Sequence, residues 1–583
     1  MENKLAKAEI HSIVQTFNFQ GKAKLLQLKR GFKNLFDTNL NSFPKSEQLS
    51  DSNPIAESKT ELWTETEPEE RFLIAGKIEN LRLAVKKING IVIPANRIFS
   101  FWKQIGKAGR LNGFVVGREL REGCIIPNVG GGLCQLSNAL YDAALQANFQ
   151  IVERHAHTQI IKGSLAEKGR DATVFWNYVD LRFKSPFDFR IEAELDAENL
   201  IVRFKAVQKI SPLVQIQKRN TTAENQHHPH SCATCGVEDC FRVVETTKYQ
   251  NFGKTAFLLD EFSPEFDEYI QKTKSETDIC FLPLDGKRFS KPNYAWTTGN
   301  FSETKQSFLT TLIRSYKSRR LAKQGAERQK NLLAMSEKLA KSFAKNLKHD
   351  VLHIVVQQNL LPFLWREGIL GGRTFDVLMN SLPIEELQKR LDFACSLHPE
   401  SKTPGDFRAA GWLVKAETEA LKNARKIITA HTEIAKLFPE KSELLKWHLP
   451  KTKDRKPKTE NLKPLVVFPA STVARKGAYE LREAIRGLNV KVMILGAELE
   501  GADFWQGFDL ETDKSDWLEK ADLVVAPAFV EHQPRRILQA FTHKIPLIVS
   551  TSCGVETLEN IELMEAGKTE DLKLKLQNIL AKI

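Results

Sequence analysis

Short apolar runs alternate with longer helical patterns along the second half of the chain, from about Gly253 to its end. Runs rich in Val, Ile and Leu are typical of strands that are buried on both faces of a sheet. Strands that alternate with helices predict parallel sheets built from βαβ units. The expected strands are residues 279–284, 351–356, 427–430, 465–469, 490–495, 523–526 and 546–549.

A charged, proline-bearing stretch, KTKDRKPKTENLKP, separates two groups of these strands and predicts a hinge between two Rossmann-like lobes. We therefore predict a multidomain α/β protein. Its expected parts are 1–70, a helical or flexible segment; 71–207, a mixed α/β module; 208–252, a linker with a Cys-rich insert; 253–450, a first lobe; 451–464, the hinge; and 465–583, a second lobe.

Composition narrows the class of protein. With 42% hydrophobic and 27% charged residues, the 583-residue chain can bury large cores. Eight cysteines are too few for a disulfide-stapled scaffold. No apolar run has the length needed to cross a bilayer, and the first residues lack the apolar stretch of a secretory signal. A cytoplasmic protein is therefore expected, either free or peripheral to the inner face of the membrane.

The formal net charge of +13 is compatible with nucleic acid, an anionic membrane surface or phosphorylated substrates as partners. Residues 314–348 are strongly basic, and their apolar positions recur at helical spacing: Leu332, Met335, Leu339, Phe343 and Leu347. We expect one amphipathic helix here, either a solvated helix of a large domain or a contact with anionic lipid. Specific nucleic-acid binding is not expected, because no recognition motif accompanies the charge.

A glycine-rich turn leads into Cys134. In GGGLCQLSNALYDAAL, a helical pattern starts at this cysteine and places Leu136, Leu140 and Ala144 on one face. The N–H groups and the dipole at a helix start favour a thiolate and would serve as an oxyanion hole. The glycines allow unusual backbone angles and a close approach of substrate.

Two histidines and an aspartate follow the predicted helix. In IVERHAHT, His155 and His157 would project from the same face of a strand. A second strand, GRDATVFW, carries Asp171 and would lie beside the first. This set predicts thiol nucleophilic catalysis, in which an imidazole activates the sulfur and a carboxylate fixes the tautomer. We predict His157 as the base and Asp171 as its orienting carboxylate, with His155 interchangeable on the pattern alone.

Two other interpretations of these residues stay open. A His-x-His pair with a cysteine also suits a zinc ion. A buried cysteine with hydrogen-bonded histidines would be purely structural, because free cysteine is commonly buried.

The motifs GGGLCQLSNALYDAAL, VERHAHT and GRDATV resemble those of the VanW family, named for a gene in vancomycin-resistance clusters. The resemblance covers about residues 71–204. It implies a loose association with the cell envelope and no particular activity, because none is settled for the family. Most members look exported and membrane-anchored; this chain shows no such segment, so a direct extracellular role is not expected. The order Cys, His, Asp is also similar to that of transglutaminase-like hydrolases.

A second group of metal-type residues lies in HHPHSCATCGVEDCFR. Thiolates spaced as in CxxC can bind one metal ion together. The predicted ligands are Cys232, Cys235, Cys240 and His230. Three cysteines and one histidine would suit zinc, and three cysteines with an outside ligand would suit an iron–sulfur cluster. A structural staple without chemistry, or an unmetallated thiol cluster, is also open.

The second lobe carries the pattern of a nucleotide site. PLVVFPASTVARKGAYELREAIRGL predicts strand, loop and helix, and ADLVVAPAFVEHQPRRILQAFTHKIPLIVS repeats the plan. Helix N-termini at the carboxyl edge of a parallel sheet are places where phosphates bind. Arg475 and Lys476 would supply positive charge for a nucleotide diphosphate, and Glu531 would bind ribose hydroxyls. A nucleotide-sugar donor is therefore the expected cofactor.

Residues 253–583 resemble retaining glycosyltransferases of the GT-B fold, those like family 4. The resemblance rests on the Lys476-Gly477 turn, on Glu531 followed by Gln539-Ala540, and on residues 544–548 (KIPLI). It implies sugar transfer from a nucleotide-sugar to a glycan or lipid-linked acceptor. In the first lobe, Gly371-Gly372-Arg373 would be an acceptor-side loop.

Three positions depart from this glycosyltransferase pattern. Ser471 stands where an Arg is usual, Gln539 replaces a second Glu, and the sequence His532-Gln533-Pro534 stands where Ser/Gly-Phe-Gly is usual. Arg535 and Arg536 would compensate for the missing cation. The leading expectation is a cytoplasmic enzyme of envelope or surface-glycan metabolism that joins sugar transfer to thiol chemistry. The alternative is a scaffolding protein that binds glycan or lipid-linked substrate without catalysis.

Overall fold

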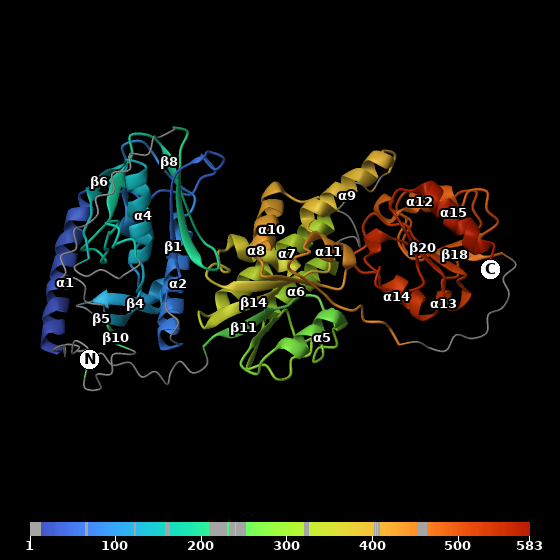
Figure 1. Cartoon of the computed structure of the whole chain (residues 1–583), viewed down its shortest axis with the longest axis horizontal. Coiled ribbons are helices and arrows are strands. Elements are labelled where there is room, and N and C mark those ends of the chain that lie inside the picture. Colours follow the sequence, from blue (N-terminus) through green and yellow to red (C-terminus); the bar gives the residue numbers. More distant parts are fainter. Residues whose placement is uncertain are drawn as a thin grey trace, which may run out of the picture. The chain divides into compact units, whose positions relative to one another are not determined.

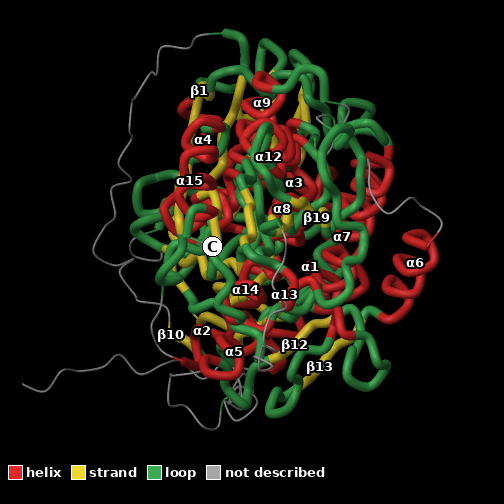
Figure 2. The backbone as a smooth tube through the Cα atoms, turned by 90° about the vertical axis from the view of Figure 1, so that its right-hand side faces the viewer, coloured by secondary structure: helices red, strands yellow, loops and turns green. Residues whose placement is uncertain are grey.

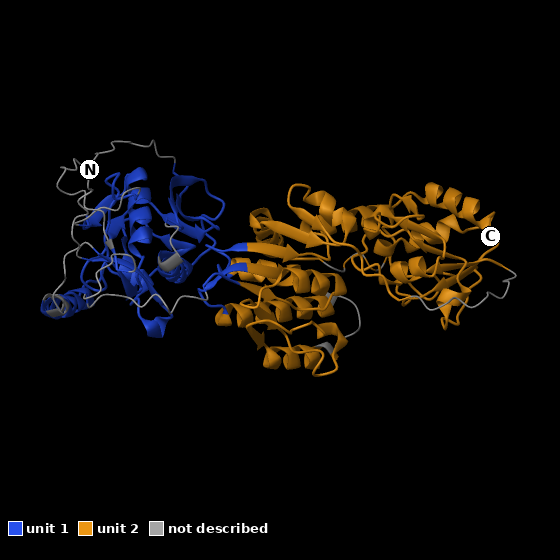
Figure 3. Cartoon of the chain, turned by 60° about the horizontal axis from the view of Figure 1, so that its bottom comes forward, with its two compact units in different colours: residues 1–254, 347–353, 367–374 blue, residues 255–346, 354–366, 375–583 orange. Residues whose placement is uncertain are grey.

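The structure is a computed structural model, which describes residues 13–64, 68–121, 124–157, 164–208, 230–232, 240, 252–319, 326–401, 403, 405, 408–451 and 463–582. These residues form two compact units (Figure 3). Unit 1 contains residues up to Lys254 together with the segments Leu347–His353 and Glu367–Thr374, and unit 2 contains the remainder.

Unit 1 is built on small sheets whose strand pairs are antiparallel, except for the parallel β10–β5 pair. Its largest sheet has the order β1-β9-β8-β2, with antiparallel pairs throughout. Helices α2 and α4 pack on this sheet (Figure 1). The elements are α1 Ile13–Leu35, β1 Pro54–Glu61, α2 Pro68–Ile88, β2 Ile91–Ile93, β3 Ile98–Ser100, α3 Phe101–Ile105, β4 Val116–Arg121, β5 Cys124–Val129, α4 Cys134–Gln146, β6 Gln150–Glu153, β7 Arg182–Lys184, β8 Phe189–Leu195, β9 Asn199–Lys205 and β10 His230–Ser231.

The core of unit 1 is aromatic where the large sheet meets β7. Phe149 and Phe204 stack with their ring centroids 5.5 Å apart, and Phe183 and Phe189 lie against Phe204. All four side chains are buried. Burial of aromatic rings contributes strongly to stability, so this cluster holds β7, β8 and β9 together beside helix α4.

The loop Gly371-Gly372-Arg373 belongs to unit 1, and it is not the acceptor-side loop that the sequence led us to expect. The Gly372 N–H donates to the Asp196 carbonyl at 2.6 Å, and the Arg82 Nε donates to the Gly371 carbonyl at 2.6 Å. Arg373 is buried, and its guanidinium donates to three backbone carbonyls. A buried arginine satisfied by backbone has a structural role, and it offers nothing to a sugar acceptor.

Unit 2 contains two lobes with parallel sheets, which confirms the expected α/β class with Rossmann-like lobes. The first sheet has the order β13-β12-β11-β14-β15-β16-β17, and the second has the order β19-β18-β20-β21-β22. Every pair of the second sheet runs parallel. Helices lie between most of the strands along both lobes. Figure 2 colours the helices red and the strands yellow.

The elements of the first lobe are β11 Lys254–Leu258, α5 Pro264–Thr273, β12 Ile279–Leu282, β13 Glu303–Gln306, α6 Phe308–Arg319, α7 Ala326–Asn346, β14 Val351–Gln357, α8 Leu361–Arg366, β15 Thr374–Leu378, α9 Ile384–Leu397, α10 Gly411–Asn423, β16 Lys426–Thr429, α11 Thr432–Leu437 and β17 Ser442–Leu444. Those of the second are β18 Leu465–Phe468, α12 Ala478–Ala484, β19 Lys491–Ile494, α13 Trp517–Lys520, β20 Leu523–Ala526, α14 Arg535–Thr542, β21 Leu547–Ser550, β22 Glu562–Met564 and α15 Thr569–Leu580.

The basic stretch 314–348 is divided between α6 and α7 and is not one helix. On α7 the apolar residues Met335, Leu339 and Phe343 are buried, as helical spacing predicts. Arg314 of α6 is also buried and pairs with Asp260 at 2.5 Å, so it is not part of a solvated basic face. Among the described residues, no helix has both the length and the apolar character that a bilayer crossing requires.

Candidate functional site

Cys134 is the first residue of helix α4, as the sequence predicts. The turn before it is held by Gly132, whose φ of 97° lies in the left-handed region. A Cβ at Gly132 would lie 2.1 Å from Cγ of Lys77. Lys77 cannot easily move away, because its buried ammonium donates to the Leu62 carbonyl at 2.8 Å. A glycine is therefore required here, both for the backbone angle and for the close approach.

We expect the substitution Gly132→Ala to destabilise unit 1 by about 2 kcal/mol, because it combines a strained φ with a clash. Thermal unfolding should show a lower midpoint, together with slower alkylation of Cys134. Gly109→Ala is the matched control, because Gly109 has open space around its Cα and an ordinary φ of −121°. Equal midpoints for the two variants would show that the turn tolerates a side chain.

His157 and Asp171 lie together beside this helix start. The backbone N–H of His157 donates to Asp171 Oδ2 at 2.6 Å, and the Nδ1 of His157 forms a hydrogen bond with Asp171 Oδ1. The Asp171 carboxylate is fully buried and the imidazole is 17% exposed. Since a carboxylate only accepts, Nδ1 carries the proton, and Nε2 is left for another partner.

That other partner is the thiol of Cys134. The pKa of His157 is raised to about 10: burial opposes the charge, but hydrogen bonds and charges of Asp171 and Cys134 outweigh it. The pKa of Cys134 is lowered: burial again opposes the charge, and a hydrogen bond and the charge of His157 more than offset it. Thr173 Oγ1 lies 3.7 Å from the sulfur. Together these interactions favour a thiolate–imidazolium pair at a lower pH than that at which an ordinary cysteine ionises.

His155 does not share this environment. Strand β6 ends at Glu153, so the predicted strand alternation does not continue to the histidines. The imidazole of His155 is 51% exposed, and its Nε2 lies 3.5 Å from Glu153. The structure thus brings together Cys134, His157 and Asp171 and leaves His155 outside. In the part of the chain that the structure describes, no three His, Cys, Asp or Glu side chains come together in a way that would hold a metal ion.

Two backbone N–H groups at the start of α4 already form hydrogen bonds within the turn, so fewer are left for the predicted oxyanion hole. The Gln135 N–H donates to the Gly132 carbonyl at 3.1 Å, and the Leu136 N–H donates to the Leu133 carbonyl at 3.1 Å. Thr173 and Asn138 were not predicted as site residues. The Asn138 amide oxygen accepts the Ala172 N–H at 2.7 Å and so holds the segment that carries Asp171 against α4. This segment is not the strand that the sequence predicts. The sequence did contain a signal for both residues, because Asn138 lies in the motif GGGLCQLSNALYDAAL and Thr173 in the motif GRDATV.

The predicted metal ligands are described only in part. Cys232 is buried and Cys240 is half-buried, whereas Cys235 and the side chain of His230 lie outside the described residues. The backbone of His230 pairs with that of Cys124 in the parallel β10–β5 pair. Cys124 is a thiol that the sequence analysis did not consider. The zinc or iron–sulfur assignment stays a prediction.

In the second lobe, Lys476 and Glu531 meet where the order of the strands reverses. Strand β18 lies between β19 and β20, and the loops after β18 and β20 carry these two residues. Ligands of open α/β sheets bind at such a reversal, outside the carboxyl ends of the strands. The Lys476 ammonium donates to Glu531 Oε2 at 2.8 Å and to the Val530 carbonyl at 2.9 Å. Gly477 permits this approach, because its φ is 77° and a Cβ would lie 2.2 Å from the Pro527 carbonyl oxygen.

Two further residues that the sequence predicts for this site, Arg475 and Gln539, belong to the same lobe. The Arg475 carbonyl accepts the Phe529 N–H at 3.0 Å, which ties the two loops together. Gln539 lies one turn after Arg535 on α14 and is half-buried. Arg536 donates to the Pro469 carbonyl at 2.8 Å, so this guanidinium is held by the loop after β18.

Two histidines that the sequence analysis did not assign lie beside Glu531. The His431 Nε2 lies 2.8 Å from the Glu531 carbonyl oxygen, which can only accept, so Nε2 carries the proton. Burial lowers the pKa of His431 and keeps it neutral. Burial, followed by the charge of Lys476, lowers the pKa of His532 well below its usual range. The sequence does contain a signal for His431, because this residue follows directly after the predicted strand 427–430.

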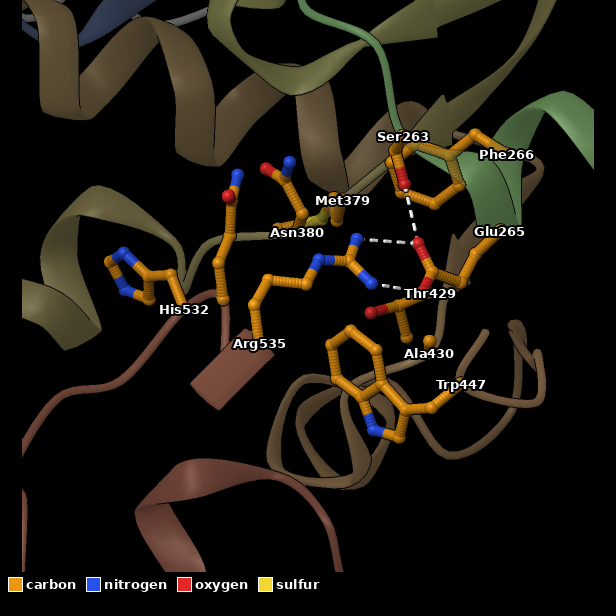
Figure 4. A pocket seen from close by; sticks show the side chains of 11 residues that line it. Ser263, Glu265, Phe266, Met379, Asn380, Thr429, Ala430, Trp447, His532 and Arg535 are labelled. Carbon is orange, nitrogen blue, oxygen red and sulfur yellow. Dashed lines mark hydrogen bonds and ion pairs between the residues drawn. The ribbon is translucent and has the colours of Figure 1, made fainter. Parts of the chain in front are cut away.

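An ion pair closes the space between the two lobes of unit 2. Arg535 of α14 donates to both oxygens of Glu265 of α5, at 2.5 and 2.7 Å (Figure 4). Ser263 and the His448 N–H also donate to Glu265. The pocket that Ser263, Glu265 and Arg535 line with Trp447 and His532 has a cavity of about 10 Å³. A nucleoside diphosphate does not fit in a cavity of this size.

Residues 76–205 match the model of the family described as VanW like protein, which confirms the resemblance and makes this part of unit 1 a VanW-like domain. The relatives include YoaR of Bacillus subtilis (strain 168), a protein described as uncharacterized, which is 36% identical over 109 residues. They also include the vancomycin B-type resistance protein VanW of Enterococcus faecalis (strain ATCC 700802 / V583), 33% identical over 132 residues. The matches cover 19% and 21% of this chain, and 35% and 47% of the two relatives.

Solved structures with similarity to the chain include sucrose-phosphate synthase from Thermosynechococcus elongatus, with a TM-score of 0.36 and 14% identity over 56% of this chain and 90% of that one. The lipopolysaccharide outer core galactosyltransferase WaaB has a TM-score of 0.33 and 12% identity over 56% and 90%. Anabaena Alr3699/HepE, in complex with UDP and glucose, has a TM-score of 0.32 and 14% identity over 56% and 89%. The fold of unit 2 rests on its own parallel sheets.

Proposed function

We propose that the chain is a two-site enzyme of envelope or surface glycoconjugate metabolism. Unit 2 would transfer a sugar from a nucleotide-sugar donor to a glycan or lipid-linked acceptor, and the VanW-like domain would act on a glycoconjugate through the thiol of Cys134. The observation that carries the proposal is the alignment of Cys134, His157 and Asp171 at the start of α4. Such an ordered set supports a nucleophile that is ionised at neutral pH.

At the thiol site, the Cys134 thiolate would attack an electrophilic acyl carbon and form a thioester. The His157 imidazolium would give its proton to the leaving amine or alcohol, and Asp171 would hold the imidazole in place throughout. Water or a second acceptor, deprotonated by His157, would then cleave the thioester and restore the thiolate. Incubation of the full chain with an activated ester, followed by mass spectrometry of trapped acyl-Cys134, tests this step. A Cys134→Ser variant that is labelled equally would contradict it.

Sugar transfer is supported by the Lys476–Glu531 pair at the reversal of strand order. The ammonium would stabilise the charge of the leaving diphosphate, and the Glu531 carboxylate would bind donor hydroxyls. A retaining course would need little acid–base chemistry from the protein, because the enzyme mainly positions the donor and the acceptor. The test is the release of UDP or GDP from UDP- and GDP-sugars in the presence of a glycan fraction.

The closed pocket leads to a prediction about Glu265. Since the Arg535–Glu265 pair holds the lobes of unit 2 together, loss of its charge should favour an open, donor-competent form. We expect Glu265→Gln to tighten the binding of UDP or GDP by about threefold to tenfold. Calorimetry measures this directly. Glu268→Gln is the matched control, because Glu268 lies on the same helix and pairs with Lys272 at the surface. Unchanged or weaker binding for Glu265→Gln would show that the pair does not compete with the donor.

A scaffolding function is the second candidate, and Gln539 favours it. A glutamine in place of a carboxylate cannot carry negative charge, and Ser471 supplies no cation. Under this alternative, the lobes would bind a glycan without turnover. Binding of a glycan in the absence of any nucleotide binding would support it.

A further inference from the structure

Helix α1 presents an apolar face to solvent. Phe17 and Leu35 are 76% and 78% exposed, and Leu25, Leu28 and Phe32 are exposed to a similar extent. In Figure 1, α1 lies at the margin of unit 1. Exposed apolar side chains that stand singly are ordinary, whereas a continuous set on one helix marks an interaction surface.

These side chains form one continuous stripe. The positions Val14, Phe17, Gly21, Leu25, Leu28, Phe32 and Leu35 follow one another at intervals of three and four residues. Residues at this spacing lie on the same face of a helix. All the side chains in this set other than Gly21 are large and apolar. We name this set the α1 stripe.

The opposite side of α1 is fixed to unit 1. Ala23 is buried, and Arg30 forms an ion pair with Glu153. The Asn177 Nδ2 donates to the Gln27 carbonyl at 2.8 Å, and the Asn34 Nδ2 donates to the Asn177 amide oxygen at 3.3 Å. These contacts orient the helix, so the α1 stripe faces away from the side that the unit holds.

Basic side chains border the α1 stripe. Lys22, Lys29 and Lys33 are exposed along one flank and Lys24 along the other, and α1 contains no Asp or Glu. A groove of about 510 Å³ adjoins the stripe, between α1 and Trp176. An apolar stripe with lysines on both flanks is the pattern of a helix that lies in a membrane interface, where the lysines reach the headgroups.

We infer that the α1 stripe docks unit 1 on an anionic lipid bilayer. A second copy of the chain is the less suitable occupant, because two such helices would bring lysines together with no acidic residue on α1 to pair with them. Anionic headgroups complement these lysines, and acyl chains complement the stripe. The groove beside Trp176 would take the edge of an acyl chain. This inference goes beyond the proposed reactions, since it concerns where the enzyme works.

The test is co-sedimentation of the full chain with vesicles of phosphatidylcholine alone or with added phosphatidylglycerol. We expect binding to the anionic vesicles, weakened by salt. A triple variant, Lys22→Glu, Lys29→Glu and Lys33→Glu, should lose about tenfold or more of its partitioning, because it reverses the charge along one flank. The triple variant Leu25→Ser, Leu28→Ser and Phe32→Ser should show a similar loss, because the stripe no longer inserts.

The matched controls lie elsewhere on unit 1. Leu111→Ser removes a fully exposed leucine, and Lys59→Glu reverses an exposed charge on β1, and both should bind vesicles like the wild type. Wild-type protein that ignores anionic vesicles, or stripe variants that still bind them fully, would overturn the inference. A dimer in sedimentation velocity that the stripe variants abolish, without vesicle binding, would overturn it in favour of a second copy.

Discussion

Substitution of His157 by glutamine is expected to slow the alkylation of Cys134 by iodoacetamide about tenfold or more at pH 7. The reason is the ionisation of the thiol. His157 lowers the pKa of Cys134 by its hydrogen bond and its charge, against the opposing effect of burial. A neutral glutamine supplies no charge, so burial, which raises the pKa of the thiol, is then opposed only by the hydrogen bonds of Val174 and Thr173. Mass spectrometry of the labelled peptides measures the rate.

The pH dependence of the same reaction has a defined sign. A lowered pKa means that the thiolate persists below the pH at which an ordinary cysteine becomes protonated. As the pH falls, the wild-type rate should therefore decline at a lower pH than that of an ordinary cysteine, and the rate of the variant should decline at a higher pH than that of the wild type. The pKa of His157, about 10, keeps the imidazolium charged throughout this range.

Controls for this prediction are present in the chain. His155→Gln should leave the rate nearly unchanged, because His155 faces Glu153 and not the sulfur. Asp171→Asn should slow the reaction less than His157→Gln, because asparagine keeps a hydrogen bond to the imidazole and loses the charge. Cys395 on α9 serves as an internal reference in the same digest. If Cys134 in the wild type reacts no faster than Cys395, the activated thiolate is not present.

The second large effect concerns the nucleotide. We expect Lys476→Ala to weaken the binding of UDP or GDP by about tenfold to a hundredfold, as loss of a charge-assisted contact to a diphosphate does. Lys476 is suited to this contact, because it is partly buried at the reversal of strand order and its ammonium can exchange the Glu531 carboxylate for a phosphate. Calorimetric titration gives the affinity.

Lys491→Ala is the matched control for this titration. Lys491 belongs to the same lobe and forms a similar Lys–Glu pair, with Glu511 at 2.7 Å, but it lies on β19 away from the predicted site. Its loss should leave nucleotide affinity within about twofold of the wild type. Wild-type protein that binds neither UDP nor GDP would remove sugar transfer and leave the scaffolding alternative.

The strands of unit 2 show what an apolar pattern can predict. Residues 523–526 were expected as a strand, and they are β20. The polar strand β13, Glu303–Gln306, was missed because it lies at the edge of its sheet and needs no apolar face. Strand β17, Ser442–Leu444, was missed for the same reason at the other edge. Two buried strands inside the same sheet, β11 and β15, were also missed, so the apolar pattern predicts most of the buried strands and not all of them.

The candidate sites show a similar division. The position of Cys134 at a helix start followed from local pattern, because glycines and helical spacing are local signals. The local pattern could not distinguish between His155 and His157. That choice depends on where β6 ends and on which ring reaches Asp171. The Arg535–Glu265 pair joins residues far apart in the chain, and nothing in the sequence near either residue indicates the other.

The burial of Arg373 is a further case of long-range structure. Its Gly-Gly-Arg sequence is typical of an exposed ligand loop, yet its guanidinium is held by carbonyls inside unit 1. The expected role was wrong because the segment Glu367–Thr374 packs with a unit that lies far upstream in the sequence. Such packing depends on the complete fold.

The most direct test of the central claim is a pH titration of the ultraviolet absorbance of the thiolate, recorded as the difference between the wild type and Cys134→Ser. The account predicts a step below the pH at which ordinary cysteines ionise, and its shift to higher pH in His157→Gln. A step at or above the ordinary value in the wild type would show that Cys134 is a protonated, structural thiol, and the proposed thiol chemistry would fail.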